Sequence, residues 1–166
     1  MQNTKLEIEI LPSLAIPVEQ DLLLKPVTSM DLRIREEQFP DQLVGDQIRL
    51  KQVLINLTKN ALKFTVGGTI KIVAAYDYAS EQLKVHIIDS GKGITQEEMK
   101  KVFEKFGKVA RTITDNQEGV GLGLNVCQRI IQESGGEMHV ISEGADQGST
   151  FMFSMKMQEP KNVPDI

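Results

Sequence analysis

The longest regular pattern of apolar residues lies between residues 46 and 64 and has the spacing of a helix. Asp46 precedes it, and a carboxylate there can accept a hydrogen bond from a free backbone N–H of the first turn. The pattern therefore predicts a long helix that begins after Asp46, ends near Phe64 and packs one face against a core. The apolar positions of that face are Leu50, Val53, Leu54, Leu57, Ala61 and Phe64.

Alternation of apolar and polar residues predicts strands on both sides of this helix. Residues 69–76 and 83–89 alternate in this way and are joined by the turn-forming stretch YDYASEQ, which indicates an antiparallel hairpin. One face of the hairpin is apolar, whereas the other carries Lys71, Lys84 and His86, a pattern typical of a sheet covered by helices on one side only. Further short strands are predicted at residues 5–10, 31–36, 136–142 and 149–157.

A second helical pattern follows a loop that is rich in glycine. Leu124, Cys127 and Ile131 are spaced as the buried face of a helix, and the string GVGLGL (residues 119–124) opens that helix. Glycines at a helix N-terminus can present backbone N–H groups and the positive end of the helix dipole to an anion such as phosphate. By itself the string is equally compatible with a mobile turn or a close helix contact, and it matches neither the Rossmann nor the Walker fingerprint.

Polar residues form a stripe beside the apolar face of the long helix. Arg49, Asn56, Asn60 and Lys63 are seven, four and three residues apart, which places them on one side of a helix with about 3.6 residues per turn. Asparagine is a poor helix former, so two asparagines on one stripe cost helix propensity unless they bind something. The alternative is that both are solvated surface residues.

The string DSGKGI (residues 89–94) follows directly from the second strand of the predicted hairpin. Asp89 would end that strand, and a carboxylate there can accept a hydrogen bond from the exocyclic amine of a base. Gly91 and Gly93 would let a flat ring approach the backbone closely. Taken alone, the aspartate is also compatible with a capped turn.

Composition and charge narrow the class of protein. The 166 residues, of which 25% are charged and 40% hydrophobic, are typical of one globular domain that can bury a core. The net charge of -4 argues against nonspecific binding of nucleic acid, and the single cysteine excludes an internal disulfide. Because the chain has no signal peptide and no apolar stretch of membrane-spanning length, we expect a cytoplasmic protein without direct membrane insertion, although the parent protein could be membrane-anchored.

Four strings occur in an order that resembles a known family. NLTKNALKFT (56–65), DSGKGI (89–94), FEKFGK (103–108) and GVGLGL (119–124) resemble the N, G1, F and G2 boxes of the ATP-binding catalytic domain of sensor histidine kinases. That domain belongs to the GHKL superfamily, which includes gyrase, Hsp90 and the mismatch-repair ATPases. The string GDQIRLKQVLINL, before the first box, is similar to that of hybrid histidine kinases.

The resemblance runs from about Asp31 to Met157 and implies an α/β fold. The expected architecture is a two-layer sandwich of the Bergerat type, with a mixed, mostly antiparallel sheet and about three helices on one face. Residues 1–30 would form an N-terminal strand and connection segment, residues 31–158 the ATP-binding catalytic domain, and residues 159–166 a linker stub. The first segment could be a sheet edge or a remnant of the connection to a preceding domain.

The resemblance also implies a site for ATP and Mg²⁺ on the long helix. Asn60 resembles the asparagine that coordinates Mg²⁺, and Asn56 resembles its companion near the transferred phosphoryl group. Lys63 would approach the phosphates as a point charge. Phe64 stands where the family has an aromatic ring over the adenine.

The remaining site residues come from the other boxes. Asp89 matches the residue that binds the adenine amino group, with support from Gly93 and Thr150. Lys108 stands where many relatives have an arginine, so it keeps the charge near the γ-phosphate without the bidentate geometry, which Arg111 could supply. A lid over residues 107–118 would cover the triphosphate. The catalytic set is then Asn56, Asn60, Lys63 and Lys108, and the nucleotide-binding set adds Phe64, Asp89, Gly91, Gly93, Ile94, Gly119, Val120, Gly121, Leu122, Gly123, Leu124 and Thr150.

The residue at position 56 favours a kinase over a hydrolase. In the gyrase, Hsp90 and mismatch-repair branches, a glutamate four residues before the metal-binding asparagine activates water, whereas the amide of Asn56 has no useful basicity. We therefore expect transfer of the γ-phosphoryl group to a protein acceptor by positioning and charge neutralisation. His86 and His139 both fall in predicted strands and do not resemble the phosphoacceptor, which would lie outside this chain.

The implied partners are the dimerisation and phosphoacceptor domain of the same kinase and, indirectly, a response-regulator receiver domain of a two-component phosphorelay. The isolated domain is expected to be a monomer. Two alternatives stay open: a serine-directed protein kinase of the anti-sigma type, and a nucleotide-binding regulatory module without transfer activity.

Overall fold

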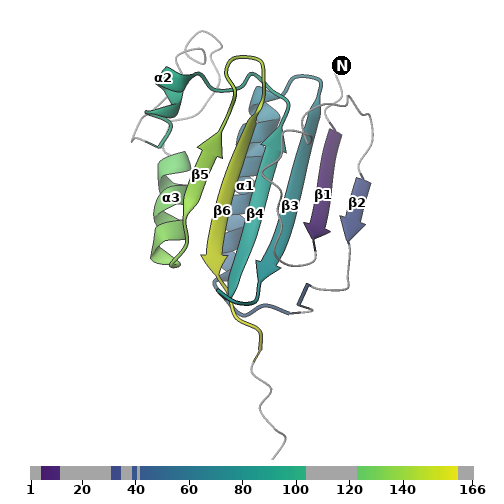
Figure 1. The fold of residues 1–166 in the computed structure, drawn as a ribbon, viewed down its shortest axis with the longest axis vertical. Helices are drawn as coiled ribbons and strands as arrows, with labels where there is room; N and C mark the ends of the chain where they lie inside the picture. Colours follow the sequence, from purple (N-terminus) through teal and green to yellow (C-terminus); the bar gives the residue numbers. More distant parts are fainter. Residues whose placement is uncertain (1–4, 12–30, 35–38, 41, 104–122, 161–166) are drawn as a thin grey trace, which may run out of the picture.

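The computed structural model describes residues 5–11, 31–34, 39–40, 42–103 and 123–160. Its centre is a six-stranded sheet with the strand order β2-β1-β3-β4-β6-β5 (Figure 1). β1 pairs with β2 and with β3 in parallel, and the other three pairs are antiparallel. The prediction of a mixed, mostly antiparallel sheet is confirmed. The strands are β1 (Lys5–Leu11), β2 (Asp31–Ile34), β3 (Thr69–Asp77), β4 (Gln82–Asp89), β5 (Met138–Ile141) and β6 (Ser149–Lys156).

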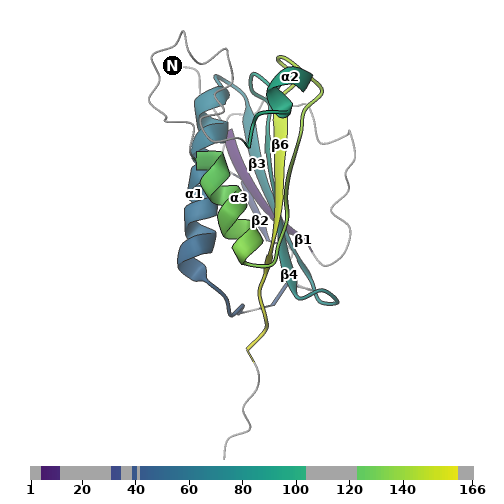
Figure 2. The same cartoon turned by 90° about the vertical axis from the view of Figure 1, so that its left-hand side faces the viewer.

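Two of the three helices in the described ranges lie side by side on one face of the sheet (Figure 2). α1 (Gln47–Phe64) runs along β4 and β6, and α3 (Gly123–Glu133) lies next to it. The short α2 (Gln96–Met99) lies beyond the end of α3 (Figure 1). Helices on one face were predicted from the sequence. Of the helices in these ranges, none combines the length and the hydropathy needed to cross a bilayer.

The start of α1 follows from local chemistry. Asp46 accepts a hydrogen bond from the backbone N–H of Arg49 through Oδ1, at 2.9 Å, as an N-cap does. The helix ends at Phe64, immediately before the glycine-containing turn that leads into β3. Both predicted ends of this helix are therefore confirmed.

The hydrophobic core lies between the sheet and the two long helices. α1 contributes Val53, Leu57 and Ala61, which are at most 5% exposed. The predicted core residues Leu50, Leu54 and Phe64 are only partly buried, because the apolar face of the helix is wider than its contact with the sheet. Facing residues come from α3 and from alternate positions of the strands, namely Cys127, Ile130, Ile131, Ile70, Leu83, Val85, Ile87, Phe151, Phe153 and Met155.

The opposite face of the sheet is less polar than its pattern predicts. Register pairs Ile72 with Ile87 on the helix side, so Val73 and Ala75 point away from the helices. Both are nevertheless buried, with exposures of 1% and 3%. The second face of β3 is therefore partly buried, although the long helices lie only on the first face, as predicted, and His86 lies on the second face with Lys71 and Lys84.

β1 lies inside the sheet, between β2 and β3, and does not form its edge. Seven residue pairs, from Lys5 with Thr69 to Leu11 with Ala75, join it to β3. The strand predicted in the first thirty residues is thus an integral part of the sheet. The division of the chain at residues 30 and 158 stays a prediction.

Candidate nucleotide-binding site

Asp89 is a buried carboxylate at the end of β4, with an exposure of 3%. Its Oδ1 accepts a hydrogen bond from the backbone N–H of Gly91 at 2.9 Å, and its Oδ2 accepts one from the hydroxyl of Ser149 at 2.5 Å. Burial raises the pKa of Asp89, while the hydrogen bonds from Ser149, Gly91 and Thr65 act against that rise.

Glycines in the loop after β4 are required by the protein's own backbone. A Cβ on Gly91 would lie 2.4 Å from the carbonyl oxygen of Phe64, because the loop sits on the C-terminal end of α1. Gly93 has a positive φ of 62°, and a Cβ there would lie 1.9 Å from the carbonyl oxygen of Gly144. These glycines therefore place Asp89 next to the end of α1, a role that the sequence reading did not include.

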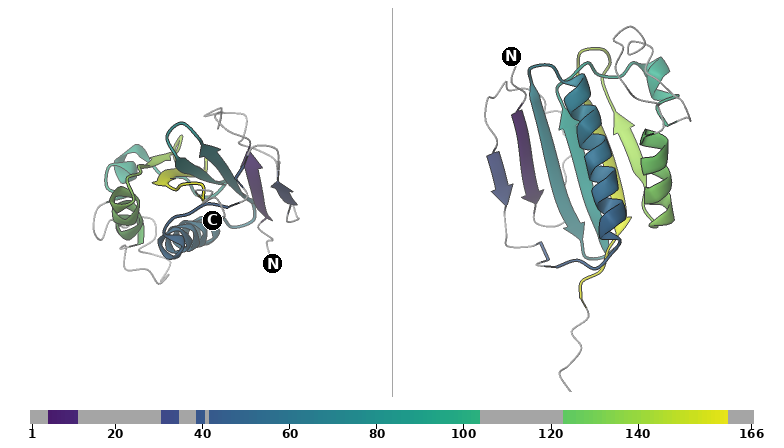
Figure 3. Two further views of the ribbon diagram at one scale, coloured as in Figure 1. Left: turned by 90° about the horizontal axis from the view of Figure 1, so that it is seen from below. Right: turned by 180° about the vertical axis from the view of Figure 1, so that it is seen from behind.

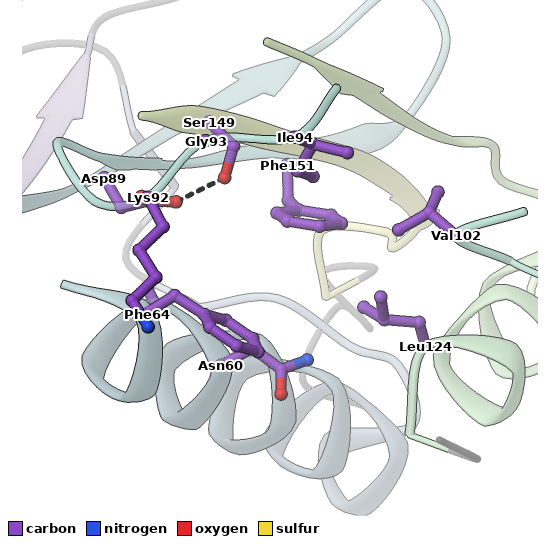
Figure 4. A pocket seen from close by; sticks show the side chains of 11 residues that line it. Asn60, Phe64, Asp89, Lys92, Gly93, Ile94, Val102, Leu124, Ser149 and Phe151 are labelled. Atoms are coloured by element: carbon purple, nitrogen blue, oxygen red, sulfur yellow. Dashed lines mark hydrogen bonds between the residues drawn. The ribbon is translucent and has the colours of Figure 1, made fainter. Parts of the chain in front are cut away.

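A pocket opens between this loop, α1 and the start of α3 (Figure 4). Its empty space is about 580 Å³, including the part that opens to solvent. The wall is mainly apolar, and the few polar groups are set at its ends. The lining residues are Asn60, Ala61, Phe64, Asp89, Lys92, Gly93, Ile94, Val102, Leu124, Ser149 and Phe151.

The predicted polar stripe of α1 divides between two environments. Asn60 lines the pocket, on the wall that α1 forms (Figure 4). Asn56, one turn earlier, donates a hydrogen bond from Nδ2 to the Sγ atom of Cys127 at 3.1 Å. A Cβ on Gly123 would lie 2.7 Å from the same nitrogen, so the first turn of α3 packs closely on this amide. Arg49 forms an ion pair with Glu133 at 3.1 Å on the helix surface.

Two predicted residues at the end of α1 are close to each other. The ammonium nitrogen of Lys63 lies 5.4 Å from the centre of the Phe64 ring, which is a cation–π contact. Phe64 itself lines the pocket, as do Ile94 and Leu124 from the other boxes. The pocket thus brings together six of the predicted residues, whereas the predicted Asn56, Lys63 and Gly91 do not line it. The six are Asn60, Phe64, Asp89, Gly93, Ile94 and Leu124.

Five lining residues were absent from the predicted site, namely Ala61, Lys92, Val102, Ser149 and Phe151. Ser149 occupies the place beside Asp89 that was predicted for Thr150, because β4 pairs Asp89 with Ser149 and Ile88 with Thr150. The side chain of Thr150 therefore points to the other face of the sheet, away from the helices, and that prediction is corrected. Lys92, within DSGKGI, extends along the pocket towards α1 (Figure 4), and Phe151 forms part of the apolar wall. The string GST (residues 148–150), which led to the prediction of Thr150, could equally have indicated Ser149.

Several predicted residues lie outside the described residues. They are Lys108, Arg111, Gly119, Val120, Gly121 and Leu122, together with the lid over residues 107–118. Gly123 is the first residue of α3, so the helix begins at the end of the glycine string, as predicted.

The two histidines lie in strands, as predicted. His86 in β4 points to the face opposite the helices, and burial lowers its pKa. His139 in β5 is on that same face, with its Nε2 atom 3.2 Å from a carboxylate oxygen of Glu137. Since the pocket lies on the helix side of the sheet, neither imidazole faces it.

Comparison with known proteins gives the family. The family of histidine kinase-, DNA gyrase B- and HSP90-like ATPases matches residues 45–159. The chain belongs to this family. The predicted superfamily is thereby confirmed.

The named relatives are sensory and histidine kinases. The adaptive-response sensory kinase SasA of Synechococcus elongatus is 45% identical over 114 residues, which cover 68% of this chain and 28% of SasA. The signal transduction histidine-protein kinase BarA of Escherichia coli (strain K12) is 35% identical over 137 residues, which cover 81% of this chain and 15% of BarA. The chain therefore spans less than a third of either relative.

Solved structures, among them the catalytic domain of a histidine kinase, have the same fold. The catalytic domain of ThkA, in a nucleotide-free form, has a TM-score of 0.62 and 27% identity, and the match covers 93% of this chain and 80% of that one. Full-length ShkA in complex with AMPPNP has a TM-score of 0.62 and 30% identity, with 74% of this chain and 24% of ShkA covered. The predicted fold class is confirmed, as is the histidine kinase branch of the family.

Proposed function

We propose that this chain binds ATP with Mg²⁺ and transfers the γ-phosphoryl group to a histidine on a dimerisation domain outside the chain. The observation that carries the proposal is the buried carboxylate of Asp89 at the end of a mainly apolar pocket. Hydrogen bonds from Gly91, Ser149 and Thr65 hold it in place at the pocket, where a carboxylate can accept a hydrogen bond from the amino group of adenine. An ionised carboxylate would repel the keto oxygen that guanine has at the same position, so ATP is preferred over GTP.

The walls of the pocket support a flat base. Ile94 and Phe151 offer apolar surface between Asp89 at one end of the pocket and Val102 at the other (Figure 4). Apolar surface of this kind favours burial of a flat aromatic ring. The carboxylate of Asp89, at the end of the pocket, would fix the orientation of that ring. The phosphates would then extend along α1 towards Asn60 and the start of α3.

The residues on α1 fit a magnesium site in which the protein supplies only one or two of the ligands. Mg²⁺ in nucleotide sites takes one or two protein oxygens and completes its shell with phosphates and water. The side-chain oxygen of Asn60, on the pocket wall, can supply such a ligand. When bound, Mg²⁺ neutralises the charge of the phosphates during transfer. Lys63 and Lys92 add positive charge near the same wall.

Asn56 supports transfer to a protein acceptor over hydrolysis. Its amide has no proton-accepting power at neutral pH, and its nitrogen is engaged with the thiol of Cys127. In the described part of the chain, Asp89 is the only carboxylate that lines the pocket, and it lies at the end proposed to bind adenine. The acceptor histidine would come from the dimerisation domain of the parent kinase, and a response-regulator receiver domain would receive the phosphoryl group afterwards.

A transfer assay tests this proposal. The chain is incubated with [γ-³²P]ATP, Mg²⁺ and a separately purified dimerisation hairpin of the parent kinase, alongside the Asn60→Asp variant. The proposal predicts labelled hairpin whose phosphate is stable in base and labile in acid, as phosphohistidine is, and much less label with the variant. A phosphate stable in acid would show a serine acceptor, and ATP binding without any transfer would show a regulatory module.

A further inference from the structure

α1 has a second apolar face, directed away from the sheet. Ile48, Ile55 and Leu62 are exposed by 81%, 45% and 48%, and Val66, just after the helix, by 67%. The three helical residues are spaced by seven. Viewed from behind the sheet, no helix or strand of the described ranges lies over this side of α1 (Figure 3, right).

The two apolar faces lie on opposite sides of the helix. At about 100° per residue, Ile48, Ile55 and Leu62 fall within about 40° of one another, and Leu57 in the core falls roughly 180° away. From Ile48 to Leu62 the exposed face extends over about 21 Å, at about 1.5 Å per residue. A helix that is apolar on two sides normally has both sides covered, and contiguous exposed apolar surface of this kind marks interaction sites.

The spacing is that of a coiled-coil seam. Positions 48, 55 and 62 repeat every seven residues, and positions 52 and 59 follow the first two of them by four, so the two series alternate as the d and a positions of a heptad. We call the series Ile48, Gln52, Ile55, Lys59 and Leu62 the α1 seam, in which the three d positions are apolar and the two a positions are polar; Val66 lies beyond the helix, which ends at Phe64. A polar residue at an a position, here Lys59, sets the register, and its charge favours an acidic partner.

Charge decides between possible occupants of the α1 seam. α1 carries Arg49, Lys51, Lys59 and Lys63 and no acidic residue, although the whole chain has a net charge of -4. A second copy of the chain would place one basic helix against another, with Lys59 near its own counterpart in a parallel register. Repulsion between like charges disfavours the pairing of two copies of α1, whereas the charge of an acidic helix is complementary to that of α1.

We propose that the α1 seam is a docking surface for one amphipathic helix of a partner segment, with an apolar residue every seven positions and a carboxylate facing Lys59. The nucleotide pocket is lined by Asn60, Ala61 and Phe64 on the other side of α1. Docking therefore leaves the pocket open, and the inference does not depend on the proposed transfer reaction.

Two synthetic helices test the proposal. Each has about three heptads with leucine at the d positions; one carries glutamate at the position that faces Lys59 and the other carries lysine there. Fluorescence anisotropy with the whole chain is expected to show saturable binding of the glutamate peptide and at least about tenfold weaker binding of the lysine peptide. In Lys59→Glu the preference should be reversed.

Variants of the apolar positions provide the controls. Ile55→Ser and Leu62→Ser should each weaken binding of the glutamate peptide by about tenfold or more. Ile141→Ser, at a residue of β5 with a similar exposure of 45%, should leave binding unchanged. Thermal unfolding and binding of a fluorescent ATP analogue in Mg²⁺, measured on every variant, separate loss of docking from loss of the fold and from any failure of the nucleotide site.

Three results would overturn the proposal. They are equal affinity for the two peptides, an unchanged preference in Lys59→Glu, and a dimer in sedimentation equilibrium that Ile55→Ser dissociates. The last result would assign the seam to a second copy of the chain.

Discussion

Ser149 donates its hydroxyl hydrogen to Asp89, and the two oxygens lie 2.5 Å apart although the residues are 60 positions apart in the sequence. The contact exists because β6 pairs with β4 in a register that sets these two residues opposite each other. It connects the last strand of the domain to the proposed base-binding carboxylate. The hydroxyl therefore fixes one oxygen of Asp89, and both residues line the pocket.

Removal of this hydroxyl should weaken nucleotide binding. In Ser149→Ala, Asp89 loses one hydrogen bond to a charged acceptor, worth about 1.5–3 kcal/mol, part of which water can restore. We expect isothermal titration calorimetry to show an affinity for Mg-ATP about tenfold lower than that of the parent chain. Thr150→Ala, at the neighbouring residue whose side chain points to the other face, is the matched control and should bind as the parent does. Equal losses in both variants would contradict this role of Ser149.

The loop after β4 should tolerate no side chain at Gly93. Gly93 and Gly135 have similar positive φ values, 62° and 70°, so alanine at either position is strained by the backbone to a similar extent, about 1–3 kcal/mol. A Cβ at Gly93 also lies 1.9 Å from the Gly144 carbonyl oxygen, whereas a Cβ at Gly135 has no atom within 4 Å. Urea unfolding should therefore show a larger loss of stability for Gly93→Ala than for Gly135→Ala. Equal losses would mean that the contact with Gly144 costs nothing.

The stability of the nucleotide-free chain should depend on the ionisation of Asp89. Burial raises the pKa of this carboxyl above its ordinary value of 3.8, so the folded state holds the proton more tightly than the unfolded state. The stability that protonated Asp89 adds to the folded state is fully present below pH 3.8, and it is lost as the pH rises through the raised pKa. Asp89→Asn does not titrate.

The free energy of unfolding of the parent chain should therefore fall relative to that of Asp89→Asn as the pH rises from acid to neutral. Urea titrations of both proteins across this range measure the difference, in which the other titrating groups cancel. A constant difference, or one that moves in favour of the parent chain as the pH rises, would contradict the direction of the pKa shift.

Local patterns were sufficient to predict the main elements of the fold. The ends of α1 follow from Asp46 and from the turn after Phe64, and the β3–β4 hairpin follows from two alternating segments close together in the sequence. These features depend on contacts between residues a few positions apart. The resemblance of the four boxes added the site, of which the described members Asn60, Phe64 and Asp89 do line one pocket.

Features that depend on pairing between distant segments were not predicted. The choice between Ser149 and Thr150 depends on the register of β6 against β4, and a shift of one residue exchanges the two faces. The engagement of Asn56 by Cys127 joins residues 71 positions apart, on two helices whose packing no local pattern specifies. The burial of Val73 on the second face of the sheet likewise comes from tertiary structure.

Binding of Mg-ATP by the parent chain and by Asp89→Asn tests the central claim most directly. Isothermal titration calorimetry should show saturable binding of Mg-ATP to the parent chain, and a loss of about a hundredfold or more in affinity for the variant, because the amide has no charge, keeps only one acceptor oxygen and places an NH2 donor where the carboxylate has a second acceptor. Retained circular dichroism and thermal unfolding would show that the variant is folded. Equal affinity of the two folded proteins for Mg-ATP would contradict the assignment of Asp89 as the residue that binds adenine.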